Sequence, residues 1–178
     1  MDAGMSDAAA MDDLAPLPAT DYETDAERFK PELRLWLRLL TCANLIENEV
    51  RARLRETLEV TLPQFDLMAA LERAPAGLTM GELSKRLMVS NGNVTGITER
   101  LMAEGLVARE PSPTDRRATL VRLTPAGRRA FLAMAQVHEG WIGDLLSGLS
   151  HEEAGQLMDL LGKVKQSARN SIARREKP

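Results

Sequence analysis

Residues 111–127 read PSPTDRRATLVRLTPAG, and the stretch around them decides the fold. Residues 106–110 (LVARE) and 119–123 (TLVRL) both have the composition and alternation of short strands. The connection between them, PSPTDRRA, is rich in residues that favour turns. The sequence therefore predicts a β-hairpin with Arg116 and Arg117 at its tip.

Two short helices are expected before this hairpin. The sequence from Thr79 to Glu82 spells a capping box that opens the first helix, and Ser90 is suited to cap the second, which Gly105 ends. The apolar face of the second helix consists of Val94, Ile97 and Leu101. Two helices that meet at about residues 88–90, followed by an arginine-tipped hairpin, predict a winged helix-turn-helix.

The opposite face of the second helix is small and polar. Small residues allow a backbone to approach another surface closely, while Asn and Thr side chains hydrogen-bond to base edges or phosphates. An ordinary amphipathic helix with a solvated face explains the same pattern. If the segment reads DNA, the candidate contact residues on it are Ser90, Asn91, Gly92, Asn93, Thr95 and Arg100.

The hairpin tip carries the charge that DNA binding needs. An arginine on a narrow protrusion suits the minor groove, and a nearby carboxylate, here Asp115, orients its guanidinium. Residues 78–129 hold nine basic and five acidic side chains, an excess of four positive charges in a protein of net charge −3. This excess favours a polyanionic partner. A solvated turn is the alternative for Asp115, Arg116 and Arg117 taken alone.

Longer helices flank the predicted winged core. Residues 31–58 have helical apolar spacing over a wide face, which indicates packing on both the same domain and another chain, or else one wide core face. A short helix starts near Pro63, another at Thr124, and a capping box at Ser150 opens the last. The first and last helices have no role in a winged core, so we expect them to pair between two chains.

The predicted fold is mainly α, a winged helix-turn-helix domain with a two-stranded wing plus N- and C-terminal dimerisation helices. The expected divisions are a disordered acidic leader (1–28), an N-terminal dimerisation helix (29–60), the DNA-binding region (61–124) and C-terminal helices that complete the dimerisation region (125–174). Residues 1–27 contain eight acidic side chains and no Lys or Arg, a composition that disfavours a packed core.

Composition excludes several classes of protein. The apolar runs are too short to cross a bilayer and no secretory signal is recognisable, so a cytoplasmic protein is expected. The single cysteine, Cys42, and the isolated His138 and His151 have no metal-ligand spacing. No nucleophile–base pair or Gly-rich phosphate loop is recognisable. We therefore expect no metal, no cofactor and no enzymatic activity.

The motifs resemble those of the multiple-antibiotic-resistance-regulator (MarR) family of bacterial transcription factors. The resemblance covers about residues 32–172. The wing signature, Asp-x-Arg followed by a strand and Leu-Thr-x-x-Gly, stands here as Asp115, Arg117, Leu123, Thr124 and Gly127, and the recognition-helix pattern stands as 90-SNGNVTGITERLMAEGLVAR-109.

The resemblance implies a homodimer that binds a pseudo-palindromic double-stranded operator, with Arg117 in the minor groove and Asp115 supporting it. Repression is the family's usual mode. One departure is Gly96, where many relatives carry Arg, so base preference does not transfer. If both recognition helices enter successive major grooves, the half-sites lie roughly 34 Å apart.

Family members are commonly released from DNA by a small molecule bound between the dimerisation helices and the winged lobe. The run LMVSNGNVTG resembles the subset that answers to aromatic acids or their coenzyme A thioesters. Every candidate ligand residue also fits plain core or a solvated face. The candidates are Arg34, Trp36, Arg38, Leu40, Asn44, Glu47, Phe65 and Met68.

Two other functions are open. Some relatives sense peroxides through a cysteine of the first helix, but Cys42 lies on the apolar stripe between Leu39 and Ile46, which predicts a buried thiol of low reactivity. A winged-helix protein-interaction module is the second alternative, and it would need neither a groove-reading helix nor an arginine wing.

Overall fold

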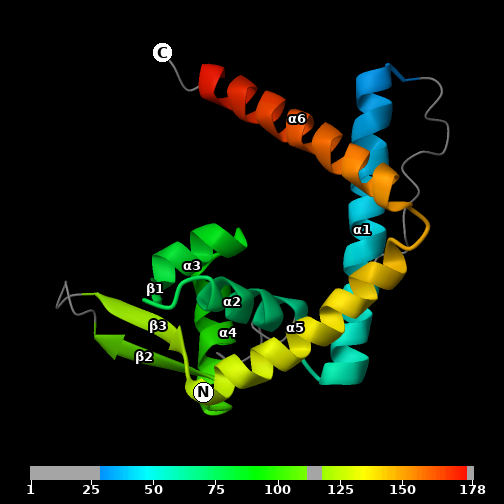
Figure 1. The fold of residues 1–178 in the computed structure, drawn as a ribbon. Helices are drawn as coiled ribbons and strands as arrows, with labels where there is room; N and C mark the ends of the chain where they lie inside the picture. The colour runs from blue at the N-terminus through cyan, green and yellow to red at the C-terminus, as the bar shows by residue number, and fades with distance from the viewer. Residues whose placement is uncertain (1–28, 112–117, 176–178) are drawn as a thin grey trace, which may run out of the picture. The chain divides into compact units, whose positions relative to one another are not determined.

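The computed structural model describes residues 29–111 and 118–175 and is mainly helical, as predicted (Figure 1). The acidic leader and the hairpin tip, including Asp115, Arg116 and Arg117, lie outside the described residues. In chain order the elements are α1 (Pro31–Leu58), α2 (Leu62–Glu72), β1 (Leu78–Thr79), α3 (Met80–Leu87), α4 (Asn91–Ala103), β2 (Val107–Pro111), β3 (Thr119–Leu123), α5 (Pro125–Leu145) and α6 (His151–Arg175).

The chain forms two compact units. The first extends to His138 and the second begins at Glu139, so α5 runs through both. The winged lobe lies in the first unit, and the second contains the end of α5 and all of α6. The boundary predicted at residues 124–125 separates regions by function, whereas these units are separated by compactness. The predicted boundary therefore stays a prediction.

The sheet has three antiparallel strands in the order β1-β3-β2 (Figure 1). Strands β2 and β3 pair from Val107 with Leu123 to Pro111 with Thr119, which confirms the predicted hairpin. Strand β1 was not predicted; its two residues pair with Val121 and Leu120. Two residues are too few to show alternation, and Thr79 carries the stronger helix-cap signal.

The starts of α2, α3 and α4 are fixed by side-chain caps. At α3, the Thr79 hydroxyl accepts from the Glu82 backbone N–H at 3.3 Å, and the Glu82 carboxylate accepts from the Thr79 backbone N–H at 2.8 Å. The backbone N–H and the hydroxyl of Thr79 both donate to the Glu82 carboxylate and lower its pKa, because they stabilise its ionised form. Ser90 caps α4 as predicted, and α2 has a capping box between Thr61 and Gln64 that the sequence analysis did not propose.

The core of the lobe lies under these helices and the sheet. The side chains of this core are almost completely buried, and each described helix and strand of the lobe contributes some of them. The helices and the sheet therefore form one packed body. The largest fully buried side chains are Leu54 of α1, Leu67, Met68 and Leu71 of α2, Leu83 of α3, Val94 and Leu101 of α4, and Val121 of β3.

The buried residues of helix α1 lie in its C-terminal half. Val50 and Leu54 are buried, whereas Leu35 and Trp36 are half exposed. Cys42 lies two turns before Val50 and is exposed, so the prediction of a buried thiol is wrong for the single chain. An apolar stripe identifies a packing face, but it does not say whether that face is covered by its own chain.

Candidate nucleic-acid interface

Helix α4 has one buried and one exposed face. Val94, Thr98 and Leu101 are at most 1% exposed. Thr98 takes the place expected for Ile97, which is half-buried, and its hydroxyl donates to the Val94 carbonyl at 2.7 Å. That bond satisfies a polar group inside the core, so a threonine is tolerated where a sequence pattern predicts an aliphatic residue.

The exposed face begins at the capped end of α4. Ser90, Asn91, Gly92 and Asn93 are all exposed, and the Ser90 hydroxyl accepts from the Asn93 backbone N–H at 3.4 Å. Thr95 is half-buried and donates its hydroxyl to the Asn91 carbonyl at 2.9 Å. The predicted group is therefore brought together on one surface. Arg100 is exposed near the other end of the helix.

Two glycines keep this face flat. A Cβ added at Gly92 or Gly96 would meet no atom within 4 Å, so neither glycine is required by packing inside the chain. The space above them is open to another molecule. A backbone without side chains at these positions is accessible to a wide surface such as a DNA groove.

The turn between α3 and α4 contains a feature that the sequence analysis missed. Met88 ends α3 in the left-handed conformation, with φ at 55°, and its side chain is 93% exposed. The Ser84 carbonyl accepts from the backbone N–H groups of Met88 and, at 3.3 Å, of Val89. The Ser84 hydroxyl in turn donates to the Val89 carbonyl at 2.6 Å. The turn is held at both sides of Met88.

Arg122 connects the two strands of the wing and packs against Gly77. Arg122 of β3 lies 3.6 Å from the Glu110 carboxylate of β2, a cross-strand ion pair. Its aliphatic part packs over Gly77, where an added Cβ would come within 2.8 Å of the Arg122 Cγ. Gly77 also has φ at 89°, so a side chain is excluded both by conformation and by space.

The Leu-Thr-x-x-Gly signature has a structural explanation at the junction of wing and α5. The Thr124 hydroxyl donates to the Gly105 carbonyl at 2.8 Å and accepts from the Gly127 backbone N–H at 2.9 Å. The Thr124 backbone N–H donates to the Leu106 carbonyl at 3.0 Å. This junction, from Gly105 to Leu106 and from Thr124 to Gly127, connects the end of α4 to the start of α5.

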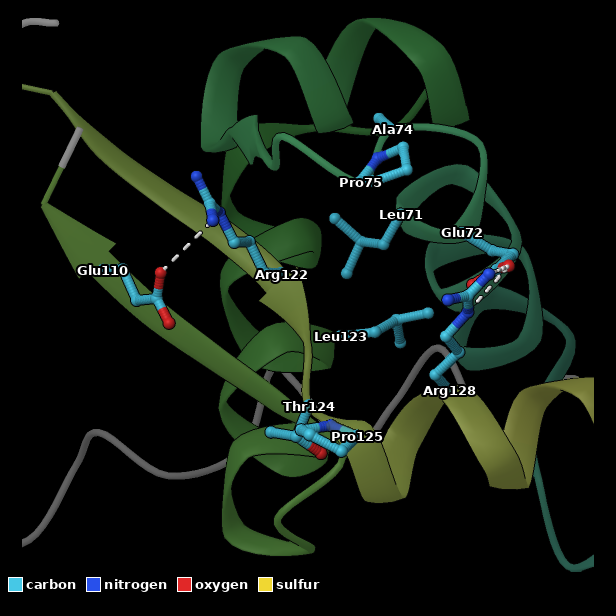
Figure 2. Close-up of a pocket in the computed structure, with 10 residues that line it drawn as sticks. All are labelled: Leu71, Glu72, Ala74, Pro75, Glu110, Arg122, Leu123, Thr124, Pro125 and Arg128. Atoms are coloured by element: carbon cyan, nitrogen blue, oxygen red, sulfur yellow. Dashed lines mark hydrogen bonds and ion pairs between the residues drawn. The ribbon is translucent and has the colours of Figure 1, made fainter. Parts of the chain in front are cut away.

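A hollow of about 410 Å³ lies beside the wing base (Figure 2). Figure 2 shows Leu71 and Leu123 between two ion pairs, Arg122 with Glu110 on one side and Arg128 with Glu72, 3.1 Å apart, on the other. The charges of the two pairs balance, and none of the residues that line the hollow belongs to the predicted ligand set.

The predicted ligand residues differ widely in their surroundings. Arg34, Trp36, Arg38 and Glu47 are exposed, and Leu40 and Asn44 are half-buried. Phe65 and Met68 are buried, and the Phe65 ring lies 5.4 Å from that of Phe131 and 4.8 Å from that of His138. These two side chains are core residues in the described chain, and the ligand set as a whole stays a prediction.

An acidic pair on α1 and α2 was not anticipated. Burial raises the pKa of Asp66, and the negative charge of Glu47 raises it further, while His138, Arg51 and Arg73 oppose the rise. Glu47 itself pairs with Arg51 at 2.6 Å. The signal was present in the sequence only as two acids on different helices, and no pattern along the chain relates them.

The chain is similar in sequence and in fold to known bacterial transcriptional regulators. A family model described as the MarR family matches residues 58–118. The transcriptional activatory protein BadR of Rhodopseudomonas palustris is 34% identical over 151 residues, which are 82% of this chain and 84% of BadR. The multiple antibiotic resistance protein MarR of Escherichia coli is 32% identical over 128 residues, 71% of this chain and 88% of MarR. The chain belongs to the MarR family.

Solved MarR structures share the fold. Apo MarR of E. coli superposes with a TM-score of 0.66 at 30% identity, covering 76% of this chain and 98% of MarR. A MarR mutant complexed with operator DNA gives a TM-score of 0.63 at 31% identity, covering 75% and 95%. The predicted MarR resemblance is confirmed, and the chain is a transcriptional regulator rather than an enzyme.

Proposed function

We propose that this MarR-family chain binds a pseudo-palindromic double-stranded DNA operator as a homodimer and reads it with the exposed N-terminal half of α4. The observation that carries the proposal is that α4 has two different faces. One face is fully buried, and the opposite face, made of small and polar residues, is open. A solved relative, MarR of E. coli, is described in complex with operator DNA.

The chemistry of that face suits base edges and phosphates. Asn91 and Asn93 offer both donors and acceptors, and Thr95 keeps acceptor capacity after donating to the Asn91 carbonyl. Gly92 and Gly96 let the backbone approach the groove. Ser90 and the start of α4 add N–H groups and a positive dipole end for a phosphate.

The wing supplies the second contact in this proposal. Asp115, Arg116 and Arg117 lie outside the described residues, in the sequence between the paired residues Pro111 and Thr119. We expect Arg117 to enter the minor groove with Asp115 orienting it, and Arg116 to meet phosphate.

The homodimer is proposed from uncovered apolar surface. Trp36 on α1 is 56% exposed, and no described residue of α6 is buried. Large apolar side chains exposed along a long helix are typical of an association face. The exposed apolar residues of α6 are Leu157, Met158, Leu160, Leu161, Val164 and Ile172.

The regulatory part of the proposal is a small-molecule effector, an aromatic acid or its coenzyme A thioester, that releases the protein from a repressed operator in the cytoplasm. Arg34 and Arg38 on α1 are exposed and suit a carboxylate or phosphate. The relative BadR is named an activator, so repression and activation are the two outcomes for a promoter-fusion assay to separate.

One experiment tests the DNA-binding proposal. Fluorescence anisotropy on the intergenic fragment beside the gene, titrated at several salt concentrations against a random duplex, should give tight, salt-sensitive and sequence-dependent binding. Binding that is equal on both duplexes, with a salt slope unchanged by Arg117→Ala, would support the protein-interaction alternative. The peroxide alternative predicts that Cys42→Ser abolishes a release by peroxide, and the effector proposal predicts no such release.

A further inference from the structure

The inference concerns Met88, the residue between α3 and α4. Single exposed apolar side chains are common on protein surfaces and need no function. Met88 differs because a large apolar side chain, 93% exposed, stands at a backbone conformation that favours glycine. The left-handed conformation costs a residue with a Cβ on the order of 1 kcal/mol.

The backbone that carries this side chain is held in place. Leu87 and Val89 on either side are half-buried, and Ser84 binds the backbone of Met88 and Val89 through its carbonyl and hydroxyl groups. Leu83, one residue before Ser84, is fully buried and anchors α3 in the core. The Met88 side chain therefore projects from a fixed support rather than from a loose loop.

Its position is next to the reading face. Met88 precedes the α4 cap, Ser90, by two residues, and in a helix-turn-helix the N-terminal residues of the second helix contact base edges in the major groove. A thioether has no hydrogen-bond donor and only a weak acceptor, so it gains nothing at a phosphate. The apolar group that the major groove offers is the C5-methyl of thymine.

We propose that Met88 is a specificity-determining residue that contacts the C5-methyl group of one thymine in each half-site. The inference rests on the proposed DNA binding through α4. Burial of one methyl group against the thioether should favour thymine over a base that lacks the methyl by about fourfold per half-site.

The test uses a duplex selected from a random pool by the full-length protein. Each thymine of the duplex is replaced in turn by deoxyuridine, which lacks only the methyl group, and affinity is measured by anisotropy. Wild-type protein should lose about fourfold at one symmetry-related thymine position when one half-site is changed, and about sixteenfold when both are.

Met88→Ala should lose that penalty at that position and keep the penalties at every other thymine, whereas Met88→Leu should keep all of them. Met102→Ala, which truncates another exposed methionine, near the C-terminal end of α4, is the matched control and should show the wild-type profile. Thermal melts and sedimentation confirm that the variants fold and associate as the wild type does.

A Met88→Ala profile identical to that of the wild type would overturn the inference while leaving the DNA-binding proposal intact. A wild type with no deoxyuridine-sensitive position would do the same. If the random pool yields no preferred duplex, the DNA-binding proposal itself fails, and the inference fails with it.

Discussion

Gly127 lies so close to the backbone of Leu106 that no side chain fits between them. A Cβ added at Gly127 would overlap the Leu106 carbonyl oxygen and lie 2.7 Å from its carbonyl carbon. The same oxygen accepts from the backbone N–H and the hydroxyl of Thr124. The glycine of the signature is thus required by a backbone-to-backbone contact, since φ at Gly127 lies outside the left-handed region.

Gly127→Ala should destabilise the fold by about 1–3 kcal/mol, because backbone rather than a flexible side chain must move. Urea denaturation measures the change. Gly140→Ala, in the same helix with no atom within 4 Å of the added Cβ, is the control and should be neutral or stabilising by about 0.5–1 kcal/mol. Equal effects of both substitutions would contradict this account of the junction.

Arg117→Ala should weaken binding to all DNA sequences alike, because a minor-groove arginine acts mainly through charge and groove shape. The slope of log affinity against log salt should fall in magnitude by about 1 for each arginine lost from a groove. Salt titrations by anisotropy provide the measurement, with Arg169→Ala on α6 as the charge-matched control. An unchanged salt slope in Arg117→Ala would show that Arg117 does not contact the DNA.

Asn93→Ala should change which bases are preferred while leaving binding to random DNA nearly unchanged, because an amide on the exposed face of α4 reads base edges. We expect about 1–3 kcal/mol of lost discrimination at one base pair per half-site. Selection from a random pool, compared between wild type and variant, gives the profile. A uniform loss at every sequence would assign Asn93 to the phosphates instead.

Asp66→Asn should stabilise the protein at neutral pH. Burial and Glu47 raise the pKa of Asp66 above its ordinary 3.8, so the folded state loses stability as pH rises from 3.8 through the raised value. The gain of the variant over wild type should therefore grow with pH and vanish below 3.8. Urea midpoints across the acid range measure it, with Glu56→Gln on α1 as control. A gain that does not depend on pH would rule out the ionisation as its cause.

Cys42 should report the proposed association of α1. The thiol is exposed in the single chain, so it should react readily with a thiol reagent in dilute protein. If a second copy covers α1, the reaction should slow as the protein concentration passes through the dimerisation range, and urea should restore the fast rate. A rate independent of concentration across that range would place the interface elsewhere.

Local signals in the sequence carried most of the fold. The caps at Thr79 and Ser90 and the turn-rich connection of the hairpin are short-range features, and the structure contains the elements they predict. Features that depend on distant residues were not accessible. The strand β1 and the Asp66–Glu47 pair need partners on other elements, and the burial of Thr98 depends on the elements packed against α4, although its hydroxyl bonds to Val94 of the same helix. The prediction of a buried Cys42 failed for the same reason, because its apolar stripe identified a packing face but not the molecule that covers it.

The candidate site also combines features that local sequence predicts with features that it does not. The cap and first turn of α4 hold four of the predicted contact residues, all exposed, and the fifth, Thr95, follows one turn after Asn91; the four are Ser90, Asn91, Gly92 and Asn93. Met88 was missed because a methionine in a helical run gives no warning that the chain turns left-handed there. The predicted ligand residues were grouped by family analogy alone, and the structure gives them different degrees of burial.

Helix α6 has a complete capping box between Ser150 and Glu153, yet none of its residues is buried. A helix with no buried residue is only marginally stable by itself, since most helix stability comes from a packed apolar face. For a homodimer, the abundance of the protein then becomes a regulatory input, because dilution loosens α6 and lowers the fraction of chains competent to act. A cell that makes more of this regulator would gain not only more molecules but a larger working share of them.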